Sequence, residues 1–342
     1  MENARRKNGR QGSVSSMPQT ISVIVPVRNA ADDIVRCLAA IFAQSRLPDE
    51  VLVVDGHSED GTVDNARKFP VKVLREDYGT RAGACQVGLE SCRGDLVAFT
   101  DADCQPEPDW LGTLERGFAS SEIIGLAGAT KAKPGKGLWP ESIRLALGTF
   151  LGSGESVQWR TYPTRRRTKS PSGCNSIYRK SVLLAAGGFT VGLSGGEDED
   201  LNRRLRRAGD FVYEPGAVVW HNHRMDGLSK LARRMLQYGA WRVESRAWAL
   251  RAVPPLAAPL LMSTLLVTLW IFALLAAGYV ALTAAMGLRF AHRHRRPALA
   301  LSIPIVYGIG HICYILGFWK QVFAGLPLRA VSQPKPLEGS SG

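Results

Sequence analysis

Three features that would assign a protein class at once are missing from this sequence. Its six cysteines form no C-x-x-C pair and show no His/Cys spacing typical of zinc, so we expect reduced thiols with a mostly structural role. The first twenty residues contain no long apolar segment, which predicts a start without a signal peptide and a cytosolic N-terminal part. No nucleic-acid docking motif or interleaved aromatic stretch is present either, which argues against a nucleic-acid binder.

Positive charge is abundant, and it lies close to two long apolar runs. The net charge is +13, and arginines crowd residues 203–207, 233–251 and 289–296. The apolar runs cover residues 253–288 and 298–319, and runs of this length indicate membrane spans. Arginines placed there favour lipid headgroups and pyrophosphates as partners.

The first apolar run is too long for one comfortable crossing of a bilayer. As a single helix, residues 253–288 would extend about 54 Å, against a hydrocarbon core of about 30 Å. The basic loop LRFAHRHRRP that follows favours the cytoplasmic side. We therefore expect a hairpin that turns around Ala276–Gly278 and a third span in 298–319, with two spans in total as the alternative.

Before these runs, strand and helix patterns alternate. Short β-branched segments, ISVIVPV, EVLVVDG, VKVLRE and DLVAFTDAD, are separated by helical periods from residue 21 onward. This alternation predicts βαβ units and a Rossmann-like α/β domain with a mostly parallel, buried sheet. In such sheets ligands bind at the carboxyl ends of the strands.

Polar residues follow three of these strands, and two of the positions have competing interpretations. Asp101 and Asp103 are two apart in extended backbone, so both carboxylates point to one side and could hold Mg²⁺ or Mn²⁺, or else cap the next helix. Asp55 could accept a hydrogen bond from a nucleobase, or it could belong to a turn and helix cap.

Four adjacent carboxylates, Glu197 to Asp200, precede a helical pattern. One or two acidic residues would be enough to complement a helix dipole. Four repel one another unless a cation is near, so we expect one of them to act as a base.

Residues 227–251 combine apolar positions at helical spacing with five arginines. This pattern fits an amphipathic helix at the membrane surface. It fits an ordinary helix packed on the domain equally well.

Five motifs in register resemble those of family 2 glycosyltransferases of GT-A fold: SVIVPVRNAADDIVRCLAAIFAQ, EVLVVDGHSEDGT, DADC, GCNSIYRK and GEDEDLNRRLRRAG. The similarity covers about residues 20–225. The C-terminal apolar segments extend it to membrane-anchored exopolysaccharide glycosyltransferases of the succinoglycan type.

The resemblance implies a role for each matching residue. Asp198 matches the catalytic base, and Asp103 matches a ligand of Mn²⁺ or Mg²⁺, with His221 as a further metal or phosphate contact. The nucleotide-sugar site would comprise Pro26, Arg28, Asn29, Asp55 and Asp101. Contacts to the acceptor or to phosphate are expected from Glu197, Asp200, Asn175 and Arg242.

The implied function is an inverting, metal-dependent transfer from a nucleotide sugar to a polyprenyl-linked acceptor, by a multi-pass protein of the cell membrane whose catalytic domain is cytoplasmic. The Q-x-x-R-W motif of processive synthases lacks its arginine in Gln237–Trp241, which predicts single additions. The alternatives are a polyprenyl-phosphate monoglycosyltransferase and an inactive nucleotide-sugar-binding membrane scaffold.

The expected organisation of the chain has five parts. They are a basic N-terminus (1–19), the catalytic domain (20–225), an amphipathic interfacial helix (226–252), the membrane region (253–320) and a tail (321–342) whose ending PKPLEGSSG looks like a linker or cloning remnant.

Overall fold

The computed structural model describes residues 19–246 and 253–325, and a nine-stranded sheet lies at its centre. The strand order is β3-β2-β1-β4-β8-β6-β9-β5, and β7 pairs with β9. The strands are β1 (Ile21–Val27), β2 (Glu50–Asp55), β3 (Lys72–Arg75), β4 (Leu96–Thr100), β5 (Cys104–Pro106), β6 (Ile123–Ala132), β7 (Arg166–Thr168), β8 (Asn175–Arg179) and β9 (Asp210–His221).

The sheet is mixed, with a parallel half that the sequence predicts well. β3, β2, β1 and β4 are parallel neighbours, while β8 joins β4 and β6 in antiparallel fashion. All seven residues of β1 are buried, as expected for a β-branched strand covered on both faces. The predicted α/β fold class is confirmed, and the sheet carries more antiparallel pairing than its first four strands indicate.

Helices cover both faces of the sheet. The cluster on one face includes Ile34 and Leu38 of α1 and Trp110 of α4, and the cluster on the other includes Leu89 of α3 and Leu201 of α8. The helices of this part are α1 (Ala31–Phe42), α2 (Thr62–Ala66), α3 (Arg81–Ser91), α4 (Trp110–Arg116), α5 (Leu138–Leu147), α6 (Phe150–Ser153), α7 (Lys180–Ala185) and α8 (Glu197–Leu205).

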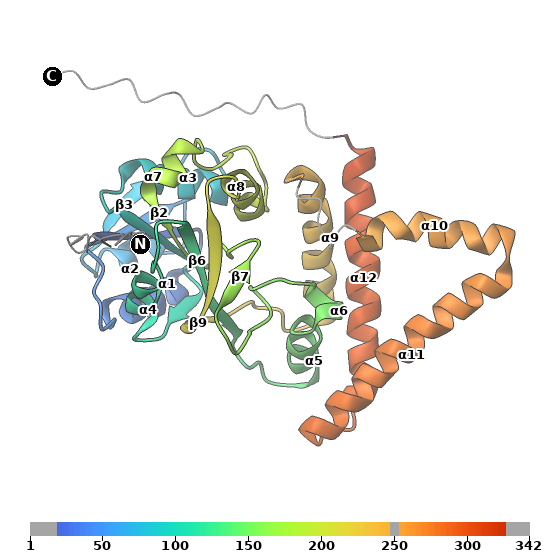
Figure 1. The fold of residues 1–342 in the computed structure, drawn as a ribbon. Helices are drawn as coiled ribbons and strands as arrows, with labels where there is room; N and C mark the ends of the chain where they lie inside the picture. The colour runs from blue at the N-terminus through green and yellow to red at the C-terminus, as the bar shows by residue number, and fades with distance from the viewer. Residues whose placement is uncertain (1–18, 247–252, 326–342) are drawn as a thin grey trace, which may run out of the picture.

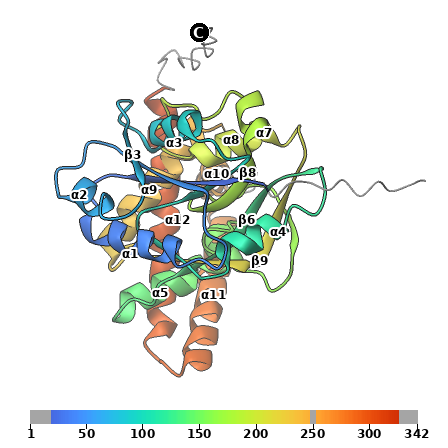
Figure 2. The ribbon, with the colours of Figure 1, turned by 90° about the vertical axis from the view of Figure 1, so that its left-hand side faces the viewer.

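The remaining helices lie beside the sheet domain, on the side away from β1–β3 (Figures 1 and 2). They are α9 (Leu228–Glu244), α10 (Val253–Val267), α11 (Leu269–His294) and α12 (Leu299–Phe323). α11 and α12 contain 26 and 25 residues, and an 18-residue stretch of each has a mean hydropathy of 2.0 and 1.9, so by length and composition each could cross a membrane. The helix break in this region comes at Thr268, not at 276–278 as expected, since α11 continues through Gly278.

α9 packs closely along α12, and two glycines permit the contact. A Cβ on Gly239 would lie 2.1 Å from the Tyr314 carbonyl oxygen, and a Cβ on Gly317 would lie 2.0 Å from that of Leu236. Leu231 and Met235 of α9 join a buried cluster with residues of α5 and α12. The apolar face of α9 is therefore covered by protein, while a position of this helix at a membrane surface stays a prediction.

Candidate active site

The strand ends and the acidic segment open into one cavity of about 950 Å³. Its lining includes most of the residues expected at the site, namely Pro26, Arg28, Asn29, Asp101, Asp103, Glu197, Asp198, His221 and Arg242. Segments nearly two hundred residues apart in sequence thus face a common space, as the rule for strand ends predicts.

Arg81 connects the aspartate pair to the acidic segment. Its guanidinium donates to Asp101 Oδ1 over 3.0 and 2.6 Å, to the Gly173 carbonyl oxygen over 3.0 Å, and to the Glu197 carboxylate. Asp198 Oδ2 accepts a hydrogen bond of 3.0 Å from Gly173 N. Asp101 and Asp198 are therefore linked through Arg81 and Gly173.

Three of the four adjacent carboxylates have cationic partners. Glu197 pairs with Arg81 and Glu199 pairs with Arg242. Asp200 accepts from Thr190 and pairs with Arg203 at 2.6 Å and Arg204 at 3.1 Å. These carboxylates form the first turn of α8, so ion pairs fix the helix in place in addition to the favourable interaction of acidic residues with its N-terminus.

Asp198 is the exception among these four carboxylates, because no ion pair holds it in the part of the chain that the structure describes. Its oxygens accept only the backbone N–H groups of Gly173 and Glu199. Burial, and then repulsion from Glu197 and Glu199, raise the pKa of Asp198 from 3.8 to about 7. A half-buried carboxylate with this pKa, facing a cavity, can exchange a proton near neutral pH.

Asp103 and His221 form the part of the site that suits a divalent cation. His221 Nε2 lies 3.2 Å from Asp103 Oδ1, and the potential ligand atoms of Asp101, Asp103, Cys104 and His221 all lie within 4.8 Å of one another. Burial disfavours the charged imidazole, but Cys174 and Asp103 raise the pKa of His221 well above its ordinary value. Carboxylate oxygens and an imidazole fit Mn²⁺ or Mg²⁺ when phosphate oxygens complete the coordination.

Asp101 has a different character from Asp103, because Arg81 already binds its carboxylate. Burial nevertheless raises the pKa of Asp101. Its carboxylate is thus engaged by Arg81, and the expected contact of Asp101 with the nucleotide sugar stays a prediction.

The structure corrects two expected contacts and qualifies two others. Asn175 is fully buried, with its oxygen accepting from Trp110 Nε1 and its amide donating to the Ala217 carbonyl oxygen, so it cannot contact a substrate. Asp200 is buried in its ion pairs and does not line the cavity.

Arg242 lines the cavity while paired with Glu199. Asp55 accepts from Ser58 N in a turn, and the cavity reaches its neighbour Gly56.

Sequence reasoning missed Arg81 and an aromatic wall. Arg81 follows the end of β3 and lies in the first turn of α3, capped by Thr80, so the strand-end rule applied to the third strand would have found it. Trp159 stacks on His223 with ring centroids 3.8 Å apart, and Tyr238 lines the cavity nearby. No local pattern marks Trp159, because it lies in the irregular segment between α6 and β7.

Comparisons with known proteins agree with this geometry. The family model described as "Glycosyl transferase family 2" matches residues 22–184. Glycosyltransferase AglE of Haloferax volcanii is 40% identical over 114 residues, which cover 31% of this chain and 36% of that protein. The pre-mycofactocin glycosyltransferase of Mycobacterium tuberculosis is 30% identical over 227 residues, which cover 64% of this chain and 46% of that protein. The chain thus spans less than half the length of these curated relatives.

A solved structure shows the same fold over most of the chain. It is the mannosyltransferase PcManGT from Pyrobaculum calidifontis in complex with GDP-Man and Mn²⁺. The superposition has a TM-score of 0.57 and 22% sequence identity, and covers 87% of this chain and 88% of that chain. At this identity the likeness concerns the fold, and the chemistry has to be argued from the residues present.

Proposed function

Because residues 22–184 form a family 2 glycosyltransferase domain of GT-A fold, we propose that the protein transfers one sugar per cycle, with inversion, from a nucleotide-sugar donor to a polyprenyl-linked acceptor held at the membrane. The family assignment supports glycosyl transfer. The cavity and its charged residues support the finer statements about metal, base and acceptor.

We place the donor between the ends of β1, β2 and β4. Arg28 and Asn29 would face the nucleotide, with Gly56 at its edge and Asp55 directly behind. Asp103 and His221 would hold Mn²⁺ or Mg²⁺, which when bound neutralises charge that develops on the departing diphosphate. Arg81 would keep Asp101 oriented toward the ribose.

Asp198 is assigned as the general base, and its lack of a cationic partner among the described residues is the observation that carries this proposal. A carboxylate that is bound to arginine has a lowered proton affinity and a fixed position. No arginine binds Asp198 in the described part of the chain, and its pKa of about 7 suits proton removal from an acceptor hydroxyl. The N–H groups of Gly173 and Glu199 fix the orientation of the carboxylate without neutralising it.

The shape of the cavity supports an acceptor that remains in the membrane. Beyond Asp198 the lining continues onto α9, α11 and α12, through Tyr238, Trp241, Tyr279, Tyr307 and Tyr314. An acceptor could therefore present its hydroxyl to Asp198 while its lipid leaves between the apolar helices. This arrangement supports anchoring at the cell membrane. The basic residues at 289–296 support a catalytic domain on the cytoplasmic side.

A donor screen followed by a turnover assay tests the proposal. Purified protein is first heated with a panel of nucleotide sugars, with and without Mn²⁺, because a bound donor raises the melting temperature. Nucleoside diphosphate release is then measured with a polyprenyl-linked saccharide and with a soluble analogue. We expect release with the lipid-linked acceptor and a divalent cation. Release with the soluble acceptor alone would contradict the membrane acceptor, and no release with any pair would support the inactive scaffold.

Asp198→Asn separates the two enzymatic alternatives. A hydroxyl acceptor needs a base, so the variant should lose about 10²–10⁴-fold in turnover. A polyprenyl phosphate attacks through an oxygen that is already ionised, so a polyprenyl-phosphate monoglycosyltransferase should lose little. The melting temperature of the variant shows whether a loss of turnover comes from the chemistry or from unfolding.

A further inference from the structure

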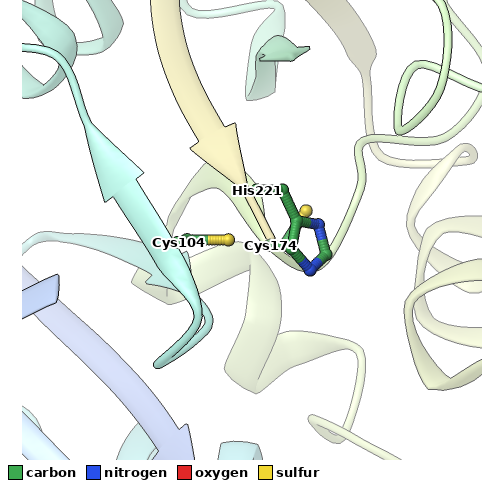
Figure 3. Close-up of side chains that lie close together, drawn as sticks. All are labelled: Cys104, Cys174 and His221. Atoms are coloured by element: carbon green, nitrogen blue, oxygen red, sulfur yellow. The ribbon is translucent and has the colours of Figure 1, made fainter. Parts of the chain in front are cut away.

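Two cysteines and a histidine from three separate segments meet beneath the aspartate pair. The Sγ atoms of Cys104 and Cys174 and a ring nitrogen of His221 all lie within 4.8 Å of one another (Figure 3). Pairing of β5 with β9 places Cys104 opposite His221, and Cys174 immediately precedes β8. The three side chains are buried, with 0%, 2% and 7% exposure. The sequence hides this cluster, because 70 positions separate Cys104 from Cys174 and 47 separate Cys174 from His221, and neither spacing belongs to a recognised metal-binding motif.

The chemistry of these three groups differs from that of the neighbouring aspartates. Two thiolates and an imidazole are ligands that select Zn²⁺ and similar thiophilic cations, whereas Mn²⁺ and Mg²⁺ prefer oxygen. In a tetrahedral zinc site with Zn–S bonds of 2.3 Å, two sulfurs lie about 3.8 Å apart. The observed separations therefore require only small side-chain shifts to accept an ion.

The cluster also has unused binding capacity and a route to the solvent. Among the described residues, His221 Nδ1 and His223 Nε2 are buried without a hydrogen-bond partner. Outside the cluster itself, Cys174 Sγ has weak hydroxyl contacts, at 3.3 Å to Ser172 Oγ and 3.9 Å to Thr130 Oγ1. Cys174 and His221 line the cavity, so an ion can reach them from the same space as the donor.

We propose that Cys104, Cys174 and His221 form a binding site for a thiophilic divalent cation of the Zn²⁺ class, separate in ligand type from the site at Asp103. Cys104 and His221 also belong to the group of possible ligands around Asp101 and Asp103. An ion bound by the cysteines therefore competes with a hard cation for His221. The proposal concerns metal binding alone and stands whether or not the chain transfers a sugar.

Cobalt(II) absorption tests the site on the purified full-length protein in detergent under reducing conditions. Cobalt bound by thiolates gives a ligand-to-metal charge-transfer band in the near ultraviolet, which carboxylate ligands do not give. We expect this band to saturate at one cobalt per chain and to disappear when Zn²⁺ is added. It should be lost in Cys174→Ser and in Cys104→Ser. It should be kept in Cys92→Ser, whose buried thiol donates to the Leu89 carbonyl oxygen and does not belong to the cluster.

Three results would overturn the proposal. They are no charge-transfer band in the unmodified protein, a band that persists in both Cys174→Ser and Cys104→Ser, and a band that Cys92→Ser removes. Asp103→Asn locates the ion further: the band should remain in this variant, because the sulfur ligands are intact. Since the band itself reports sulfur ligation in the unmodified protein, a variant that fails to fold does not remove the test.

Discussion

Asp198 and its three acidic neighbours show how one sequence run can serve two purposes. Glu197, Glu199 and Asp200 are bound by arginines that come from α3, α9 and α8 itself. These pairs place the segment at the cavity and concentrate negative charge around Asp198. Burial raises the pKa of Asp198 and repulsion from Glu197 and Glu199 raises it further, so two of the ion-paired carboxylates tune the proposed base.

The pH dependence of turnover should report this tuning. Burial and the two flanking glutamates raise the pKa of Asp198 to about 7, and a general base works only when deprotonated. We expect kcat/KM to rise about tenfold per pH unit below 7 and to level off above it. The profile is measured between pH 5.5 and 8.5 at saturating divalent cation.

Glu199→Gln provides the matched control for this prediction. The substitution removes one of the two negative charges that raise the pKa and leaves Arg242 as a nearby positive charge. The acid limb of the profile should therefore move to lower pH. An acid limb that stays in place would show that the titrating group is not Asp198.

Arg81 should be the most sensitive arginine of the site. Arg81→Gln leaves Asp101 and Glu197 without their shared cation, in a partly buried place where breaking a pair costs about 3 kcal/mol. We expect a clear fall in melting temperature together with weaker donor binding. Arg93→Gln is the comparison, because Arg93 is 87% exposed and its pair with Glu50 should contribute less than about 1 kcal/mol. Equal melting temperatures for the two variants would contradict this account.

At the residue scale the sequence predicted positions better than partners. The aspartates at strand ends and the acidic segment could be found because strand periodicity and family motifs are local signals. The partners of the acidic segment could not, because Arg81 and Arg242 lie about 116 and 43 residues from the carboxylates they bind. The same limit explains why Asn175 was misassigned: its motif position gave no sign that Trp110 and Ala217 use both ends of its amide.

At the scale of elements, the contact between α9 and α12 depends on backbone approach at Gly239 and Gly317. A methyl group on Gly317 would lie 2.0 Å from a backbone oxygen of α9, and backbone cannot move aside as a flexible side chain can. Sequence patterns indicated an amphipathic helix at this position. They could not indicate which helix would cover it, because the partner begins 55 residues after α9 ends.

Two alanine substitutions in one helix test this contact. Gly317→Ala should lower the free energy of unfolding by about 1–3 kcal/mol through overpacking. The helix propensity of alanine offsets about 1 kcal/mol of that loss. Gly308→Ala receives the same gain without the clash, because nothing lies within 4 Å of its added Cβ. Melting temperatures in one detergent compare the two. A Gly317→Ala variant as stable as Gly308→Ala would contradict the close packing.

At the scale of the whole molecule, α12 has surroundings unlike those of an isolated membrane span. Residues 231–243 of α9 run beside it, and exposed Lys230 and Arg233 lie on α9. A charged side chain at the centre of a bilayer costs about 2.5–3.5 kcal/mol, so a helix flanked in this way is poorly suited to cross. α10 and α11 instead project away from the sheet domain as a V with its apex at Thr268 (Figure 1).

We therefore expect both ends of α12 on the side of the catalytic domain, with the α10–α11 hairpin as the inserted element. Three crossings, which the sequence favoured, would place the two ends on opposite sides. So would the two-span alternative if α11 and α12, the two described helices long and apolar enough to cross a membrane, are its spans. The test labels His292→Cys and Phe323→Cys with a membrane-impermeant maleimide in vesicles of each orientation. Both variants carry Cys313→Ser, because the other cysteines are buried. Ser120→Cys marks the side of the catalytic domain. Matching labelling at all three positions supports the hairpin. Opposite labelling at position 323 would restore a crossing by α12 and require α9 to lie within the bilayer beside it, where Arg233 would need a partner of opposite charge.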